Sequence, residues 1–155
     1  MKILIVDDAA SERDAAVEQL AVHGHALTIV RGFTDARRLL EKRMAFDVIL
    51  TDLMMPCESP VPGPYGEMNL GKMMPYGLIL ALMAKKDGVP KVAIVSHGDT
   101  HMYPMFWTAN LISGEMMPGL WAFTDFLCPT KENADGPAVK EWSVALSRMT
   151  TGENA

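Results

Sequence analysis

The sequence predicts an α/β fold in which helices cover both faces of a parallel sheet. Two short apolar runs, Lys2–Val6 and Val48–Thr51, each continue without a break into a carboxylate, at Asp7 and Asp52. Unbroken runs of this length are typical of strands that are buried on both faces. Segments with helical spacing alternate with such strands, and this alternation implies right-handed crossovers and a parallel sheet.

Length and composition indicate one soluble domain. The chain has 155 residues, of which 49% are hydrophobic and 21% are charged, as in ordinary globular proteins. We expect a single domain over residues 1–150 and a frayed tail over 151–155.

Charge, cysteine content and hydropathy argue against several kinds of partner. The net charge is -5 and no basic stripe is visible in the sequence, which disfavours a nucleic-acid partner. Cys57 and Cys128 have no CxxC spacing, and two such cysteines favour a reducing cytoplasm. Pro75 and Gly77 interrupt the longest apolar stretch, so we expect no membrane span and a cytoplasmic location.

Two helices and a further strand are predicted before Asp52. The first helix starts at Ser11, in a near match to a capping box, and is closed by Gly24. Ala26–Val30 follows as a short strand. Thr34 opens the second helix, whose apolar residues share one face. These residues are Ala36, Leu39, Leu40 and Met44.

The second half of the chain continues the alternation. Tyr76–Lys86 has the composition of a short apolar helix, and Lys91–Ser96 is the fourth apolar strand. The fifth strand is predicted at Trp121–Leu127. Pro137 suits the first turn of a closing helix. The apolar face of that helix consists of Val139, Trp142, Ala145, Leu146 and Met149.

Carboxylates follow two of the predicted strands. Because neighbouring parallel strands end at the crevice where open α/β sheets bind ligands, Asp7, Asp8 and Asp52 are expected to share one pocket. Such a cluster repels itself unless a hard divalent cation lies among the groups. Mg²⁺ bound by one or two carboxylates and a substrate phosphate fits this demand. The residues therefore predict a Mg²⁺ site beside Asp52.

Three motifs resemble the receiver domains of two-component response regulators. They are Val6-Asp7-Asp8, Thr51-Asp52-Leu53-Met54-Met55-Pro56 and Val92-Ala93-Ile94-Val95-Ser96. The resemblance implies a flavodoxin-like, doubly wound sheet of five parallel strands in the order 2-1-3-4-5, with helices on both faces. It also implies that Asp52 accepts a phosphoryl group.

The same resemblance assigns roles to the residues around Asp52. Asp8 would bind Mg²⁺ directly, Asp7 through a water molecule, Asp52 by its carboxylate and Met54 by its backbone carbonyl. Ser96 matches the hydroxyl residue that donates to a phosphoryl oxygen in the family and moves when phosphate arrives.

The chain departs from the family where a Lys normally ends the fifth strand before a Pro. The residue before Pro129 is Cys128, and the nearest Lys along the chain is Lys131. A thiol cannot replace an ammonium as a counter-charge for phosphate. Three alternatives stay open: Lys131 reaches back as a substitute, the site works without an ammonium, or phosphoryl chemistry has been lost.

Two segments are longer than in the family. Pro56 and the Gly77 that matches the family's third-helix glycine lie 21 positions apart. The residues near 57–75 therefore form an insertion, whose Pro and Gly content predicts a surface loop. A second insertion is predicted near 97–119. Ten of the 13 Met residues fall between residues 54 and 117, and they are either core filler or an adaptable binding surface.

A separate metal site is a weaker interpretation of the residues after Ser96. His97, Asp99 and His101 could act as ligands, but Gly98 disfavours the helix that would place the two histidines on one face. We therefore favour a polar loop beside the carboxylates.

The functional expectation is a stand-alone receiver that a histidine kinase or phosphotransfer protein phosphorylates on Asp52. It is not an enzyme, apart from self-catalysed phosphorylation and dephosphorylation, and it acts as a monomer or weak homodimer through a downstream protein partner. The alternative is a non-phosphorylated pseudo-receiver that serves as an interaction module. A small-molecule binder is disfavoured because no Gly-rich phosphate loop follows the first strand.

Overall fold

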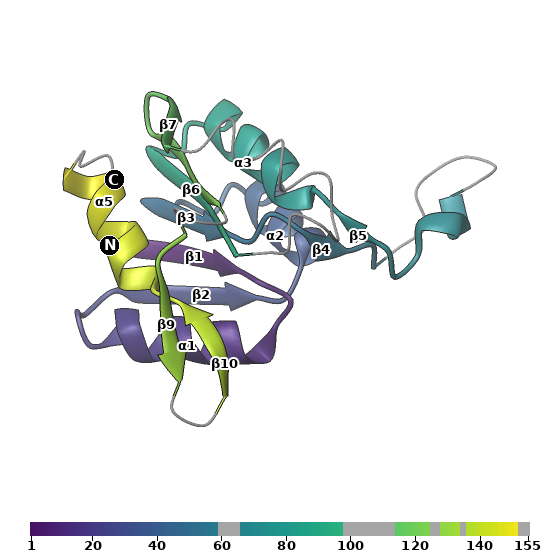
Figure 1. Ribbon diagram of the computed structural model, residues 1–155. Helices are drawn as coiled ribbons and strands as arrows, with labels where there is room; N and C mark the ends of the chain where they lie inside the picture. The colour runs from purple at the N-terminus through teal and green to yellow at the C-terminus, as the bar shows by residue number, and fades with distance from the viewer. Residues whose placement is uncertain (59–65, 98–113, 125–127, 134–135, 152–155) are drawn as a thin grey trace.

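The computed structural model describes residues 1–58, 66–97, 114–124, 128–133 and 136–151. A six-stranded sheet runs through the middle of the molecule, in the order β2-β1-β3-β6-β8-β7 (Figure 1). Its strands are β1 (Lys2–Val6), β2 (Ala26–Val30), β3 (Val48–Thr51), β6 (Lys91–Ser96), β7 (Gly114–Met117) and β8 (Leu120–Thr124).

The five strands from β2 to β8 are parallel to one another. Their order confirms the predicted 2-1-3-4-5 arrangement. The sheet has one strand more than predicted, because β7 pairs with β8 in the antiparallel direction at the sheet edge.

Helices cover both faces of the sheet, as predicted, because alternate strand residues point to opposite sides. On one face Leu4 and Val6 pack with α2 (Phe33–Glu41) and α3 (Tyr76–Lys86). On the other face Ile3 and Ile5 pack with the first and last helices, α1 (Ala10–Ala21) and α5 (Trp142–Thr151).

Most predicted element boundaries lie close to the observed ones. The expected capping box at Ser11 is not formed, because α1 starts one residue earlier and Ala9 is its N-cap residue. Of the predicted fifth strand, residues 125–127 lie outside the described residues. The same is true of residues 98–113 of the second insertion and residues 152–155 of the predicted tail.

The first insertion forms an arm that projects away from the sheet (Figure 1). Its base is a two-stranded ladder of β4 (Met55–Pro56) and β5 (Met73–Met74), and it carries a 3-10 helix, η1 (Gly66–Asn69). The ladder continues beyond both strands, since the Cys57 N–H donates to the Lys72 carbonyl over 2.9 Å. The base of the insertion is therefore more regular than the predicted loop.

Gly77 lets the start of α3 pack against the end of β3. A Cβ atom at this position would lie 1.8 Å from the main-chain oxygen of Asp52, so any other residue would force the helix away. The Gly77 N–H also donates to the Leu53 carbonyl over 3.0 Å. This contact fixes the turn that presents Asp52.

A hairpin precedes the last helix. Its strands are β9 (Thr130–Asn133) and β10 (Gly136–Lys140), which pair in the antiparallel direction. The prediction that Pro137 opens the closing helix is therefore wrong, since α5 starts at Trp142. The hairpin lies against α1 (Figure 1).

In the part of the chain that the structure describes, no helix is both long enough and apolar enough to cross a lipid bilayer.

Candidate functional site

Asp52 lies directly after β3, at the carboxyl-terminal edge of the parallel sheet. The Asp52 N–H donates to the Val6 carbonyl over 2.8 Å, which ties the residue to the end of the neighbouring strand β1. Asp52 is buried, with 8% of its surface exposed. The sheet therefore holds a largely desolvated carboxylate in a fixed position.

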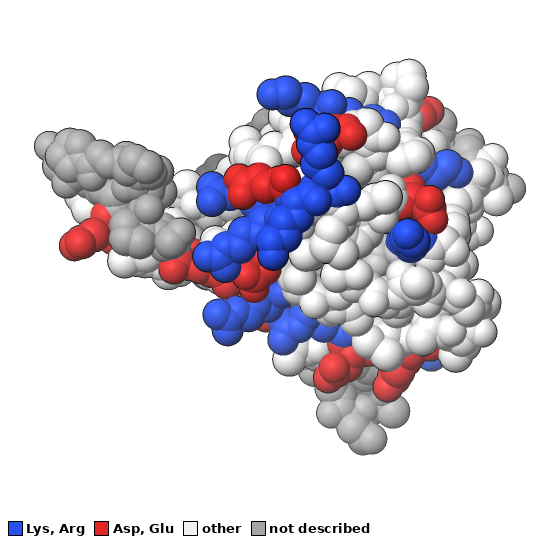
Figure 2. Space-filling view, turned by 180° about the vertical axis from the view of Figure 1, so that it is seen from behind, with Lys and Arg blue, Asp and Glu red and all other residues white. Residues whose placement is uncertain are grey.

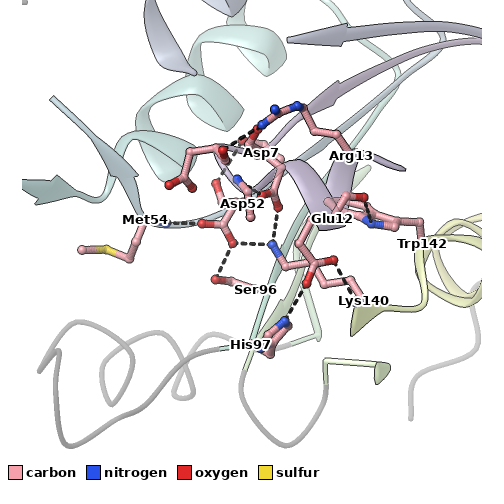
Figure 3. Close-up of polar contacts among 12 residues, drawn as sticks. Asp7, Glu12, Arg13, Asp52, Met54, Ser96, His97, Lys140 and Trp142 are labelled. Atoms are coloured by element: carbon pink, nitrogen blue, oxygen red, sulfur yellow. Dashed lines mark hydrogen bonds and ion pairs between the residues drawn. The ribbon is translucent and has the colours of Figure 1, made fainter. Parts of the chain in front are cut away.

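Three donors surround the Asp52 carboxylate (Figure 3). Oδ1 accepts hydrogen bonds from Ser96 Oγ over 2.7 Å and from Lys140 Nζ over 2.6 Å. Oδ2 accepts the Met54 N–H over 3.0 Å. A hydroxyl, an ammonium and a main-chain N–H thus converge on one carboxylate.

Asp7 shares the Lys140 ammonium with Asp52. Lys140 Nζ donates to Asp7 Oδ2, and the Ala9 N–H donates to Asp7 Oδ1 over 2.9 Å. Burial raises the pKa of Asp7 to about 6, because the attraction of Lys140 offsets only part of the desolvation and Asp52 adds a second negative charge. A further positive charge near Asp7 would therefore stabilise its ionised form.

Asp8 is the exposed member of the acidic group. Partial desolvation and the Asp52 charge raise the pKa of its carboxyl group. Arg13 Nη1 donates to the main-chain oxygens of Asp7 and Asp8 over 2.9 and 2.7 Å, so α1 fixes the turn after β1. The side chain of Asp8 stays accessible to a ligand in the cavity.

Lys140 is the last residue of β10, and its side chain is 3% exposed. Its ammonium also lies 5.1 Å from the centre of the Trp142 ring. Burial alone would lower the pKa of Lys140, but the charges of Asp52 and Asp7 raise it above the ordinary lysine value. Lys140 is therefore a permanent cation in the site.

Lys131, which the sequence suggested as a substitute ammonium, lies elsewhere. It is exposed on β9 and lines a polar cavity of about 410 Å³ together with residues of α1 and α5. The cavity at Asp52 has a volume of about 210 Å³ and is lined by Lys140 instead. The ammonium beside Asp52 thus comes from the same hairpin, but from its other strand.

The Asp52 cavity is also lined by residues from four parts of the chain: Asp8, Glu12, Met54, Met73 and His97. Met73 belongs to β5, so the arm contributes directly to the wall. His97 Nε2 lies 2.8 Å from Glu12 Oε1. Asp99 and His101, the other members of the alternative metal site, lie outside the described residues.

Within the described ranges, no three His, Cys, Asp or Glu side chains form a group that could hold a metal ion. The predicted ligands Asp7, Asp8, Asp52 and Met54 nevertheless all line the same cavity. A metal ion there would rely on one or two carboxylates and on oxygen atoms from outside the chain.

The sequence interpretation missed Lys140 and Glu12. The signal for Lys140 was the apolar pair Ala138-Val139 leading into it, which repeats the pattern of a strand ending in a charged residue. Helical spacing of Val139 with Trp142 obscured that pattern. Glu12 gave no signal, because a single Glu in the first turn of a helix is ordinary.

The doubly wound sheet has the fold of response regulator receiver domains, and acidic residues follow its first and third strands in chain order. Two solved structures are similar to this chain. The response regulator receiver protein from Sinorhizobium medicae WSM419 is similar with a TM-score of 0.57 and 16% identity, over 98% of this chain and 92% of that one. A receiver domain protein from Clostridium thermocellum gives a TM-score of 0.52 and 17% identity, over 97% and 94% of the two chains.

At these identities the similarity shows the fold. No protein-family model matches the sequence, and no curated protein matches it. The chain thus has the receiver fold, with a sequence that shares only 16% and 17% of its residues with the two solved structures.

Proposed function

We propose that the chain is a response regulator receiver in which Asp52 accepts a phosphoryl group from a histidine kinase or phosphotransfer protein. One observation carries the proposal: Ser96 Oγ and Lys140 Nζ both donate to Asp52 Oδ1. A phosphoryl group spreads negative charge over three equatorial oxygens, and enzymes stabilise that charge with preorganised donors and cations. A hydroxyl and an ammonium are already in place.

In the proposed transfer an Asp52 oxygen attacks phosphorus and forms an O–P bond. The N–P bond of the donor phosphohistidine breaks, and the imidazole leaves with the bonding pair and takes up a proton. The hydrogen bonds that Ser96 and Lys140 give to the carboxylate would then pass to the phosphoryl oxygens. Hydrolysis would return the carboxylate and inorganic phosphate.

The donor atoms around the cavity fit Mg²⁺. Asp7, Asp8 and Asp52 bring three carboxylates to a pocket in which Lys140 supplies the one ammonium among the described residues. Burial, and after it the negative charge of Asp52, raise the pKa of Asp7. Asp8 and Asp52 would bind the ion directly with the Met54 carbonyl, and Asp7 through water. Bound Mg²⁺ would neutralise charge on the incoming phosphoryl oxygens.

The charged surface favours a protein partner. Figure 2 shows Lys and Arg side chains gathered in a band on the face seen from behind. Exposed basic residues of α2 and its ends include Arg31, Arg37 and Arg38, and each pairs with a carboxylate, of Glu58, Glu41 and Asp35 respectively. Basic residues that are paired in this way are a poor match for a phosphate backbone.

The pseudo-receiver is supported by a different feature of the same contacts. Lys140 touches Asp7 and Asp52 at once, so the site has a counter-ion without any metal. In that alternative the ion pairs are structural, and the arm provides a constitutive binding surface.

Incubation with acetyl phosphate and Mg²⁺, followed by intact-mass measurement, separates the two functions. The receiver gains one phosphoryl group, and Asp52→Asn does not. Glu67→Gln, an exposed change on the arm, is the matched control and should phosphorylate like the unaltered chain. No mass gain at saturating donor and Mg²⁺ would favour the pseudo-receiver.

A further inference from the structure

Glu12 is a buried carboxylate for which the proposed transfer has no use. It lies in the first turn of α1 and is 5% exposed. Burying a carboxylate is costly unless hydrogen bonds compensate for the lost water. Its partners therefore indicate what it does.

The contacts of Glu12 join three parts of the site (Figure 3). Oε2 accepts the Lys140 N–H over 2.9 Å, and Oε1 lies 2.8 Å from His97 Nε2. The main-chain oxygen of Glu12 accepts Trp142 Nε1–H over 3.1 Å. Glu12 thus connects α1 with the end of β6 and with the junction between β10 and α5.

Gln19 binds the same segment, residues 140–143, through other main-chain groups. Gln19 Nε2 donates to the Lys140 carbonyl over 2.9 Å, and Gln19 Oε1 accepts the Ser143 N–H over 3.2 Å. Glu12 and Gln19 lie seven residues apart, which places them on one face of α1. One helix face therefore binds both the N–H and the carbonyl of Lys140.

The main chain of Lys140 needs the contacts with α1 because Lys140 lies on a hairpin outside the central sheet. It ends β10, which pairs only with β9 among the described strands and not with the central sheet. A two-stranded hairpin is marginally stable by itself. An anchor to α1 is therefore a means to hold the ammonium within hydrogen-bonding distance of Asp52.

The ionisation of Glu12 agrees with this role. Burial would raise its pKa, but hydrogen bonds from His97 and from the Lys140 N–H lower it below the ordinary value. Glu12 therefore offers two anionic oxygen acceptors at neutral pH.

We propose that Glu12 and Gln19 are positioning residues that fix the main chain of Lys140 and so place its ammonium on Asp52. The effect on reactivity rests on the proposed function of Asp52. The positioning itself concerns only the folded chain and can be tested without phosphorylation.

The first experiment measures the accessibility of the Lys140 amine. The folded chain is treated with an amine-acylating ester, and the modification of each lysine is followed by mass spectrometry. We expect Glu12→Ala to raise the acylation rate of Lys140 by about tenfold, because a charged acceptor is lost. Exposed Lys131 on the same hairpin is the internal reference and should not change.

Two further variants make the experiment decisive. Glu12→Gln keeps an oxygen acceptor for the Lys140 N–H and should protect Lys140 nearly as well as Glu12 does. Gln19→Ala changes a half-buried side chain, so it tests the anchor even if Glu12→Ala does not fold. Unchanged Lys140 acylation in folded Gln19→Ala and Glu12→Ala would overturn the proposal.

The second experiment follows phosphorylation of Asp52 by acetyl phosphate. If Glu12 acts through Lys140, Glu12→Ala combined with Lys140→Ala should be no slower than Lys140→Ala alone, since residues that act through one group are not additive. Independent losses that multiply would contradict positioning. If the unaltered chain takes up no phosphoryl group, the proposed function fails, while the acylation rates still decide whether Glu12 and Gln19 hold Lys140.

Discussion

Lys140 Nζ lies 2.6 Å from Asp52 Oδ1, although 88 residues separate them in the sequence. The site therefore contains the ammonium that the end of the fifth strand lacks. The three alternatives left open by the sequence assumed that Lys131 was the only candidate. Because Lys140 on the hairpin supplies the cation instead, an ammonium at Asp52 requires neither Lys131 nor a lysine before Pro129.

The first prediction is that Lys140→Ala slows phosphorylation of Asp52 by about a hundredfold to a thousandfold, the usual loss when one preorganised donor is removed. The rate is measured by intact mass against time with acetyl phosphate and Mg²⁺. Lys131→Ala is the matched control on the same hairpin and should react at the unaltered rate. Equal slowing in both variants would contradict the assignment of Lys140.

Strands that consist of an unbroken apolar run were the most predictable part of the fold. The bounds of β1, β2 and β6 follow from apolar runs that the core of a parallel sheet requires. The hairpin was not predictable in this way. Thr130–Asn133 contains no apolar alternation, so only its pairing with β10 in the structure shows that it is a strand.

The site residues that lie at the ends of apolar runs were predictable from the sequence. Asp7, Asp52 and Ser96 each follow or end an apolar run, and parallel strands bring those ends together. Lys140 and Glu12 reach the site through a hairpin and a helix whose relative placement no local pattern specifies. The ladder of the arm was missed because strands of two residues are too short to show a period.

The second prediction concerns Mg²⁺. Asp8→Asn should weaken Mg²⁺ binding by about tenfold or more, because an anionic ligand is lost. Titration is followed by Trp fluorescence, since Trp142 lies against the Lys140 ammonium, and EDTA should reverse the change. Asp87→Asn, an exposed carboxylate after α3, is the control. A binding curve that Asp8→Asn leaves unchanged would remove Asp8 from the site.

The third prediction is a pH dependence of stability in EDTA. The pKa of Asp7 is about 6 in the folded chain, against an ordinary aspartate value of 3.8 when the chain is unfolded, so the folded state binds the proton more tightly. Below the lower value both states are protonated, and this contribution to stability is fully present. As pH rises from about 4 to 6 the free energy of unfolding should fall, by at most roughly 3 kcal/mol.

Urea unfolding at a series of pH values checks this dependence. In Asp7→Asn most of the decrease in the free energy of unfolding with rising pH should disappear. In Asp14→Asn, an exposed change on α1, the decrease should remain. Saturating Mg²⁺ should reduce the fall, because the ion favours the charged carboxylate. Stability that rises over the same pH interval in EDTA would show that Asp7 is not the group responsible.

The fourth prediction is that the outer arm is dispensable for folding. Replacing residues 58–70 with a short Asn-Gly turn keeps the pairing of Met55 with Met74 and of Pro56 with Met73. The change removes the exposed pair of Glu58 and Arg31, which is worth no more than about 1 kcal/mol. Urea unfolding should stay cooperative, and loss of cooperativity would place the arm in the core.

The last prediction uses Cys128 to test whether the source of the ammonium matters. Cys128 is buried, and burial raises the pKa of its thiol to about 12, with Lys140 lowering it and Asp52 raising it. The thiol therefore lies within electrostatic reach of both residues. We expect a lysine at this position to approach Asp52 when the Lys140 side chain is removed.

Cys128→Lys should accordingly restore much of the phosphorylation rate that Lys140→Ala loses. In the presence of Lys140 the same change should destabilise the chain, because it brings a second ammonium into a closely packed site. Rates by intact mass and midpoints by urea unfolding are compared for the two single variants and the double variant. If the double variant reacts no faster than Lys140→Ala while remaining folded, the transfer depends on the hairpin geometry and not only on a cation beside Asp52.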